Sequence, residues 1–66
     1  MNWDQIKGRW KEFKGSIRQR WGKLTDDDLE VIKGQRESLA GKLQERYGYE
    51  KDKADSEIRE FEESLR

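Results

Sequence analysis

Large apolar residues in the first third of the chain recur at intervals of three or four positions. They are Trp3, Ile6, Trp10, Phe13, Ile17, Trp21 and Leu24. An α-helix turns once every 3.6 residues, so this spacing places all of them on one helical face. Similar stripes follow at Leu29, Ile32, Leu39, Leu43 and Tyr47, interrupted by Arg36, and at Ala54, Ile58, Phe61 and Leu65. A period of two is absent, so we predict an all-α protein without strands.

Glycines mark an internal duplication. They fall in two sets spaced by seven residues: Gly8, Gly15 and Gly22, then Gly34, Gly41 and Gly48. Residues 6–22 (IKGRWKEFKGSIRQRWG) and 32–48 (IKGQRESLAGKLQERYG) are related by an offset of 26, with six of 17 positions identical. We interpret residues 1–66 as a single domain made of two related helical units and a closing helix.

Local signals predict where the helices begin and end. Thr25 followed three residues later by Asp28 is typical of a capping box, so a helix should begin at Asp26. Gly22 and Gly48 are expected to adopt the left-handed conformation that ends a helix. The predicted helices lie near 3–21, 26–33, 35–47 and 51–64. Glycine is unfavourable inside a helix, and the sequence leaves open whether helices break near Gly8 and at Gly34.

Composition limits what the chain can be. It has 66 residues, of which 45% are charged and 30% hydrophobic, with a net charge of zero and a mean hydropathy of −1.39. These values describe one small, highly polar domain with a thin core, expected as a monomer or weak homodimer. Because Cys and His are absent, we expect no disulfide and no structural zinc. Because long apolar runs are absent too, we expect no membrane span, no signal peptide and a cytoplasmic location.

The reactive side chains in the sequence do not indicate catalysis. Without His or Cys, a nucleophile would have to be a Ser or Thr hydroxyl, and none lies in a nucleophile motif. The glycine spacing matches no phosphate-binding loop. The acidic run 26–28 lacks the pattern of a calcium loop, and we interpret it as a helix cap. We predict a non-enzymatic protein with no catalytic residues, cofactor, metal or small-molecule substrate.

Charge is distributed unevenly along the chain. Residues 1–24 hold seven basic and two acidic side chains, whereas residues 25–66 hold eight and thirteen. A basic ridge is expected beside the tryptophans of the first helix, formed by Lys7, Lys11, Lys14 and Arg18. Such a ridge could follow a phosphate backbone while the aromatic rings stack on bases. Alternatively, the basic stems cover the rim of the core, or the first helix pairs with acidic groups of the last helix, among them Asp55, Glu60, Glu62 and Glu63. We favour these alternatives because nucleic-acid modules are usually basic overall.

Three blocks of sequence carry a family resemblance: WKEFKG at 10–15, WGKLTDDDL at 21–29 and LAGKLQERYGY at 39–49. In these blocks and their spacing, the chain resembles the CsbD-like family of short bacterial proteins associated with general stress responses. The resemblance implies an all-helical fold of about four helices, packed as two crossed hairpins in a SAM-domain-like arrangement. It also implies a cytoplasmic, stress-induced protein, and it brings no catalytic or ligand-binding residues.

The expected function is therefore that of a small non-enzymatic stress-response protein, acting either by binding an unknown partner or by a bulk protective effect. The alternative is a weak nucleic-acid-binding module that uses the basic ridge.

Overall fold

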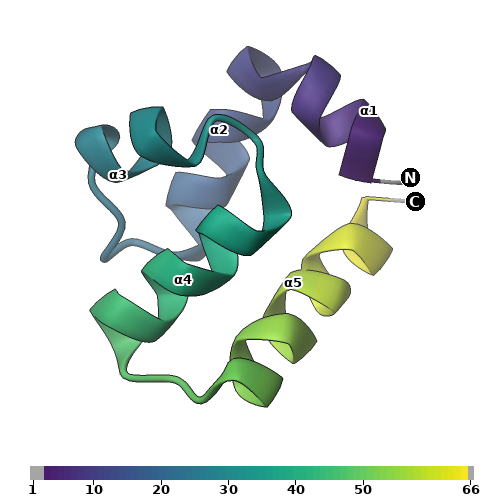
Figure 1. The fold of residues 1–66 in the computed structure, drawn as a ribbon. Helices are drawn as coiled ribbons and strands as arrows, with labels where there is room; N and C mark the ends of the chain where they lie inside the picture. Colours follow the sequence, from purple (N-terminus) through teal and green to yellow (C-terminus); the bar gives the residue numbers. More distant parts are fainter. Residues whose placement is uncertain (1–2, 66) are drawn as a thin grey trace.

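The computed structural model describes residues 3–65, which fold into five α-helices (Figure 1). They are α1 (Trp3–Gly8), α2 (Trp10–Arg20), α3 (Asp26–Ile32), α4 (Arg36–Tyr47) and α5 (Lys51–Ser64). No strand occurs in this part of the chain. The predicted all-helical small bundle is confirmed, with five helices in place of about four.

The extra helix arises because the predicted helix 3–21 is interrupted at Arg9. This residue has φ −120° and ψ 38°, outside the helical region, and it follows Gly8, a weak helix former. Its amide donates to the carbonyl oxygens of both Gln5 (3.1 Å) and Ile6 (3.2 Å), which closes α1. As a result α1 and α2 run in different directions (Figure 1).

A second interruption separates α3 from α4. Lys33 (φ 48°) and Gly34 (φ 81°) both adopt left-handed conformations there. The helices after the two interruptions begin at Trp10 and Arg36, positions that differ by 26, the offset of the sequence repeat. Each repeated segment folds as a helix end, a break and a new helix.

The predicted helix caps agree with the structure at two of three places. Thr25 and Asp28 form the expected capping box at the start of α3, and Gly48 ends α4 with φ 69°. The prediction for Gly22 was wrong. Among the described residues, positive φ values occur only at Lys33, Gly34 and Gly48. The chain leaves α2 at Trp21 instead, whose φ of −119° and ψ of 81° carry its ring into the core.

The core is built from all five helices and from the α2–α3 link. Its buried members are Ile6, Ile17, Trp21, Leu24, Leu29, Ile32, Leu39, Ala40, Leu43, Ala54, Ile58 and Phe61. The rings of Trp21 and Phe61, with centroids 5.5 Å apart, join the end of α2 to α5. Trp10 and Phe13, which belong to the predicted apolar stripe, are only partly buried at the rim of this core.

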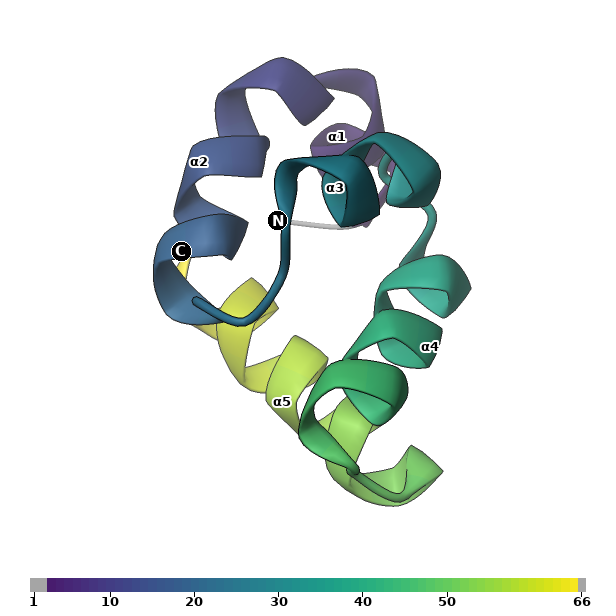
Figure 2. The same cartoon turned by 90° about the vertical axis from the view of Figure 1, so that its left-hand side faces the viewer.

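The helices pack as a hairpin with three shorter helices placed across it. α4 and α5 run antiparallel side by side, as Figures 1 and 2 both show. α1 lies against the α3–α4 turn: the Trp3 indole N–H donates to the carbonyl oxygen of Gly34. A Cβ added at Gly34 would lie 2.9 Å from the Cα of Lys7. Only glycine permits this close approach of the two segments.

Candidate functional site

The predicted basic ridge does not form one continuous surface. Lys7 belongs to α1, and the break at Arg9 separates it from the other three residues on α2. Lys14 contacts Glu30 of α3, with 3.3 Å between its Nζ and a carboxylate oxygen, and Arg18 pairs with Asp26 at the start of the same helix. The ridge is therefore divided into a paired half, on which α3 supplies the counter-charges, and an unpaired half.

The unpaired half borders a hollow at the α1–α2 junction. Six consecutive residues, 7–12, line a space of about 360 Å³ there. Lys7 and Lys11 make no ion pair within residues 3–65, whereas Arg9 and Glu12 pair at 3.0 Å. The Trp10 ring also lines this space, and its buried indole nitrogen has no hydrogen-bond partner among the described atoms. The hollow thus combines two free ammonium groups with an aromatic side chain.

Among the described residues, ion pairing between the basic first segment and the last helix is limited to one contact. Arg20 lies 3.7 Å from Glu60, and its guanidinium also lies over the Trp21 ring, 5.5 Å from the centroid. The acidic groups Asp55 and Glu62 instead contact Arg36 of α4, at 3.4 and 3.5 Å. The arginine that interrupts the second apolar stripe is thereby held between two carboxylates of α5.

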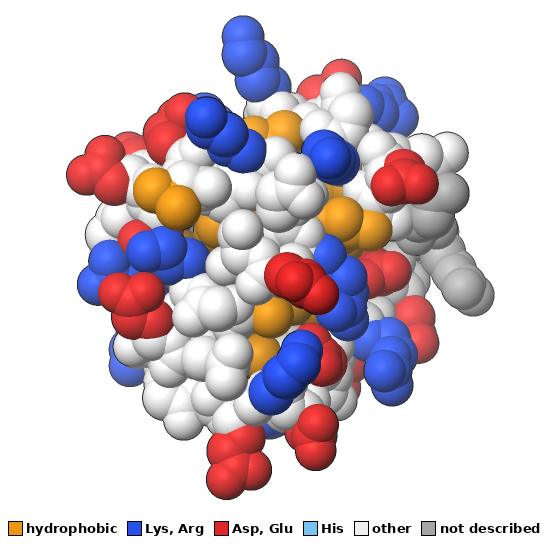
Figure 3. All heavy atoms as spheres, viewed as in Figure 1, with side chains coloured by type: hydrophobic (Ala, Val, Ile, Leu, Met, Phe, Trp, Pro, Cys, Tyr) orange, Lys and Arg blue, Asp and Glu red, His pale blue; other side chains and the backbone are white. Residues whose placement is uncertain are grey.

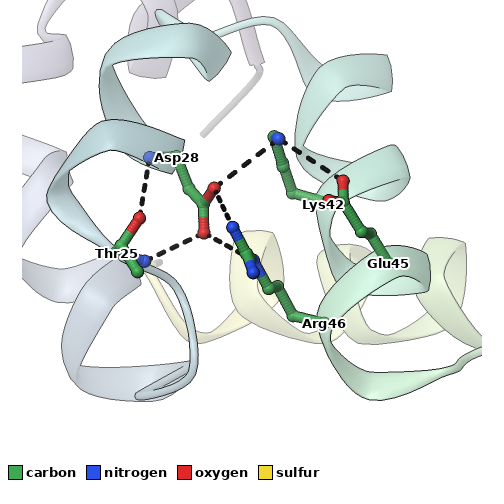
Figure 4. Close-up of polar contacts among 5 residues, drawn as sticks. All are labelled: Thr25, Asp28, Lys42, Glu45 and Arg46. Atoms are coloured by element: carbon green, nitrogen blue, oxygen red, sulfur yellow. Dashed lines mark hydrogen bonds and ion pairs between the residues drawn. The ribbon is translucent and has the colours of Figure 1, made fainter.

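A cluster of polar side chains from α3 and α4 surrounds Asp28 (Figure 4). The Asp28 side chain is 3% exposed and accepts two hydrogen bonds of 2.9 Å from the Arg46 guanidinium, one to each oxygen. It also accepts from the Thr25 amide at 3.0 Å, while the Thr25 hydroxyl accepts from the Asp28 amide at 3.1 Å. Lys42 approaches the same carboxylate at 3.5 Å. The capping box of α3 is in this way fastened to α4.

These contacts explain the acidity of Asp28. The hydrogen bonds from Arg46 and from the Thr25 amide hold the pKa of Asp28 far below its usual range, against the opposing effect of burial. The same pair raises the pKa of Arg46. A carboxylate that stays ionised and fully engaged is a fixed anchor and a poor proton acceptor. We interpret the cluster as a structural lock between two helices.

Sequence reasoning identified half of this lock. The Thr25–Asp28 box spans three residues and is visible as a local motif. Arg46 lies 18 residues after Asp28, and no spacing rule links the two positions. Lys42 and Arg46 do stand four residues apart, on one helical face, which is the only local sign of a shared target.

A second hollow lies between α2 and α5. It has a volume of about 390 Å³ and is lined by Ser16, Gln19, Arg20, Phe61, Ser64 and Leu65. The Ser64 hydroxyl donates to the Phe61 carbonyl oxygen at 2.7 Å and is thus engaged in its own helix. Within residues 3–65, no three acidic side chains gather in a metal-binding arrangement. None of the described helices has the length and apolar character needed to span a bilayer.

Comparison with known proteins identifies the family. Residues 4–56, which run from α1 into α5, match the model of the CsbD-like family. The chain belongs to the CsbD-like family. This CsbD-like chain is 57% identical over 63 residues to UPF0337 protein ECA0631 of Pectobacterium atrosepticum, covering 96% of the chain and 91% of the relative. It is 55% identical over 62 residues to UPF0337 protein YjbJ of Escherichia coli, covering 94% and 90%. It is also 55% identical over 65 residues to UPF0337 protein PA4738 of Pseudomonas aeruginosa, covering 98% and all of that protein.

Proposed function

We propose that this chain is a non-enzymatic, cytoplasmic stress-response protein that acts by binding another macromolecule through its folded surface. The stress-response part follows the general association of the CsbD-like family. The binding part rests on the structure, and the alternative is a protectant whose effect depends on composition alone.

The observation that carries the proposal is the fixed arrangement of charge. Twelve buried apolar side chains hold the helices, and the Asp28–Arg46 lock adds a specific link between α3 and α4. A hydrated protectant needs neither a core nor a lock, because bulk effects depend on composition. A rigid display of particular charges at particular places is what recognition of a partner requires.

The lack of reactive chemistry supports the non-enzymatic part. Asp28, the one buried carboxylate within residues 3–65, is tied to Arg46 with a depressed pKa, and the Thr25 hydroxyl is used within the capping box. General acid–base catalysis at neutral pH needs a group whose pKa lies near 7 and which faces a substrate. Asp28 meets neither condition.

A scrambled chain of identical composition tests the proposal. Wild-type protein, used as bait in extracts of stressed bacterial cells, should retain a reproducible partner by cross-linking, and the scrambled chain should retain none. Both chains should also be dried together with a labile enzyme. Equal protection by the two chains, together with no specific partner, would show that composition alone acts and would overturn the proposal.

Nucleic-acid binding is the second candidate, and one feature favours it: Lys7 and Lys11, which make no ion pair within residues 3–65, line the same hollow as Trp10. Against it stand a net charge of zero and the engagement of Lys14 and Arg18 with α3. Titration of labelled DNA and RNA at rising salt distinguishes the two candidates. A nucleic-acid module should lose affinity steeply with salt and on replacement of the four ridge residues, whereas a flat response would exclude it.

A further inference from the structure

The fold brings the two copies of a repeated tripeptide together. Ile6–Gly8 and Ile32–Gly34 both read Ile-Lys-Gly and are related by the offset of 26. Each copy ends a helix, with its isoleucine fully buried and its lysine exposed. The two copies touch, because Gly34 packs against the backbone of Lys7. Positions far apart in sequence therefore place two lysines at one end of the molecule.

Ion pairing leaves this end with unbalanced positive charge. Within residues 3–65, five basic side chains make no ion pair: Lys7, Lys11, Lys23, Lys33 and Arg59. Three of the five gather at the same end, Lys7 and Lys11 around the α1–α2 hollow and Lys33 beside Gly34. We call these three the lysine surface. Figure 3 shows blue side chains, with some red ones, at the upper end of the molecule, where Figure 1 places the junction of α1 and α2.

We propose that the lysine surface, formed by Lys7, Lys11 and Lys33, is a docking site for an acidic segment of a partner protein. This inference rests on the proposed function and names where the partner binds and what chemistry it presents. Two or three carboxylates of an extended segment would pair with the ammonium groups. An apolar residue of the same segment would rest on the partly buried Trp10 ring.

Stabilisation of helix ends does not account for this surface. Lys7 and Lys33 stand at the carboxyl ends of α1 and α3, where a cation is favourable. That role needs one cation on each helix, and it does not need both on one surface. Moreover, Lys33 has φ 48°, a conformation in which Gly or Asn is preferred. The backbone alone would favour another residue at this position.

The extent of the surface favours a short acidic segment over a nucleic acid. A phosphate backbone would continue along α2, but Lys14 and Arg18 are already paired with Glu30 and Asp26. Asp4 lies one turn before Lys7, and Glu12 directly follows Lys11. These carboxylates would repel a continuing polyanion, whereas a segment with few charges ends before reaching them.

Fluorescence anisotropy with a defined probe tests the inference. The probe is a labelled, end-capped decapeptide of Gly and Ser that carries three Glu residues and one central Leu, and the comparison ligand is an oligothymidylate of equal charge. The test variant combines Lys7→Gln with Lys33→Asn, because Asn tolerates the left-handed conformation and the variant should stay folded. The matched control combines Lys51→Gln with Lys53→Gln, which removes the same charge from α5, far from the surface in sequence.

The expected result is binding of the peptide at low salt, with amide chemical-shift changes confined to residues near 6–11 and 32–35. The test variant should bind about 2- to 30-fold more weakly, the effect of losing two exposed ion pairs, and the control should bind nearly as wild type. Equal weakening in the two variants, no peptide binding, or tighter binding of the oligothymidylate would overturn the inference. A captured partner that still binds the test variant would refute this surface and leave the proposed function standing.

Discussion

Gly34→Ala tests the docking of α1 more directly than any other substitution. A Cβ at this position would lie 2.9 Å from the Cα of Lys7, and the backbone has φ 81°. An L-residue in a left-handed conformation costs about 1–2 kcal/mol. Displacing the backbone of α1 adds about 1–3 kcal/mol, by analogy with overpacked cores. We expect a loss of about 2–5 kcal/mol, a large share of the roughly 3–10 kcal/mol typical of a domain of this size.

Substitutions at two other glycines separate the cost of the left-handed conformation from the cost of displacing the α1 backbone. Gly48 has φ 69° with nothing within 4 Å of an added Cβ, so Gly48→Ala should lose only the conformational part, about 1–2 kcal/mol. Gly15 lies within α2 and is equally open, so Gly15→Ala should stabilise the protein by about 1 kcal/mol. Urea denaturation followed by far-ultraviolet circular dichroism measures all three. If Gly34→Ala costs no more than Gly48→Ala, α1 is not docked against the α3–α4 turn.

Three further predictions address the core, the lock and the corrected cap. Leu43→Ala should cost about 2–5 kcal/mol in urea denaturation, whereas Val31→Ala, at a side chain 63% exposed, should stay within about 0.5 kcal/mol; similar losses would contradict the assigned core. The pKa of Asp28 is lower in the folded than in the unfolded protein, so ionised Asp28 stabilises the fold. This contribution to the free energy of unfolding is complete above the unfolded pKa of about 3.9 and is lost as the pH falls further. Between pH 5 and 2 the urea midpoint should therefore fall more steeply for wild type than for Asp28→Asn, and parallel curves would argue against the lock. Gly22→Val should change the melting temperature little, because Gly22 has no positive φ and an added Cβ meets nothing within 4 Å. A large drop would indicate that Gly22 does adopt the left-handed conformation predicted from the sequence.

Local patterns account for most of what the sequence predicted correctly. Apolar spacing and the capping residues depend on neighbours within about four positions, so the limits of α3, α4 and α5 could be predicted to within a residue or two. Gly22 shows how a local rule fails. Burial of the Trp21 ring beside Phe61 determines how the chain leaves α2, and that contact spans 40 residues.

The candidate site could be predicted only in part, because it depends on contacts between helices. The four residues of the basic ridge share a face only if the first helix is continuous, and the break at Arg9 separates Lys7 from the rest. The acidic partners of Lys14 and Arg18 lie on α3, which the sequence assigned to capping alone. The close approach of Gly34, the residue after Lys33, to the backbone of Lys7 is a contact between helices that only the structure shows.

The hydrogen bond from the Trp3 indole to the Gly34 carbonyl oxygen has a consequence for how the chain folds during synthesis. A growing polypeptide emerges from its amino end, so α1 is synthesised before Gly34, the residue 31 positions after Trp3 with which Trp3 forms this hydrogen bond. α4 and α5, by contrast, are joined by only Gly48, Tyr49 and Glu50, and contacts that close short loops form fastest. The α4–α5 hairpin, although translated after α1, is thus expected to fold early, and α1 to dock only once its partner segment has formed.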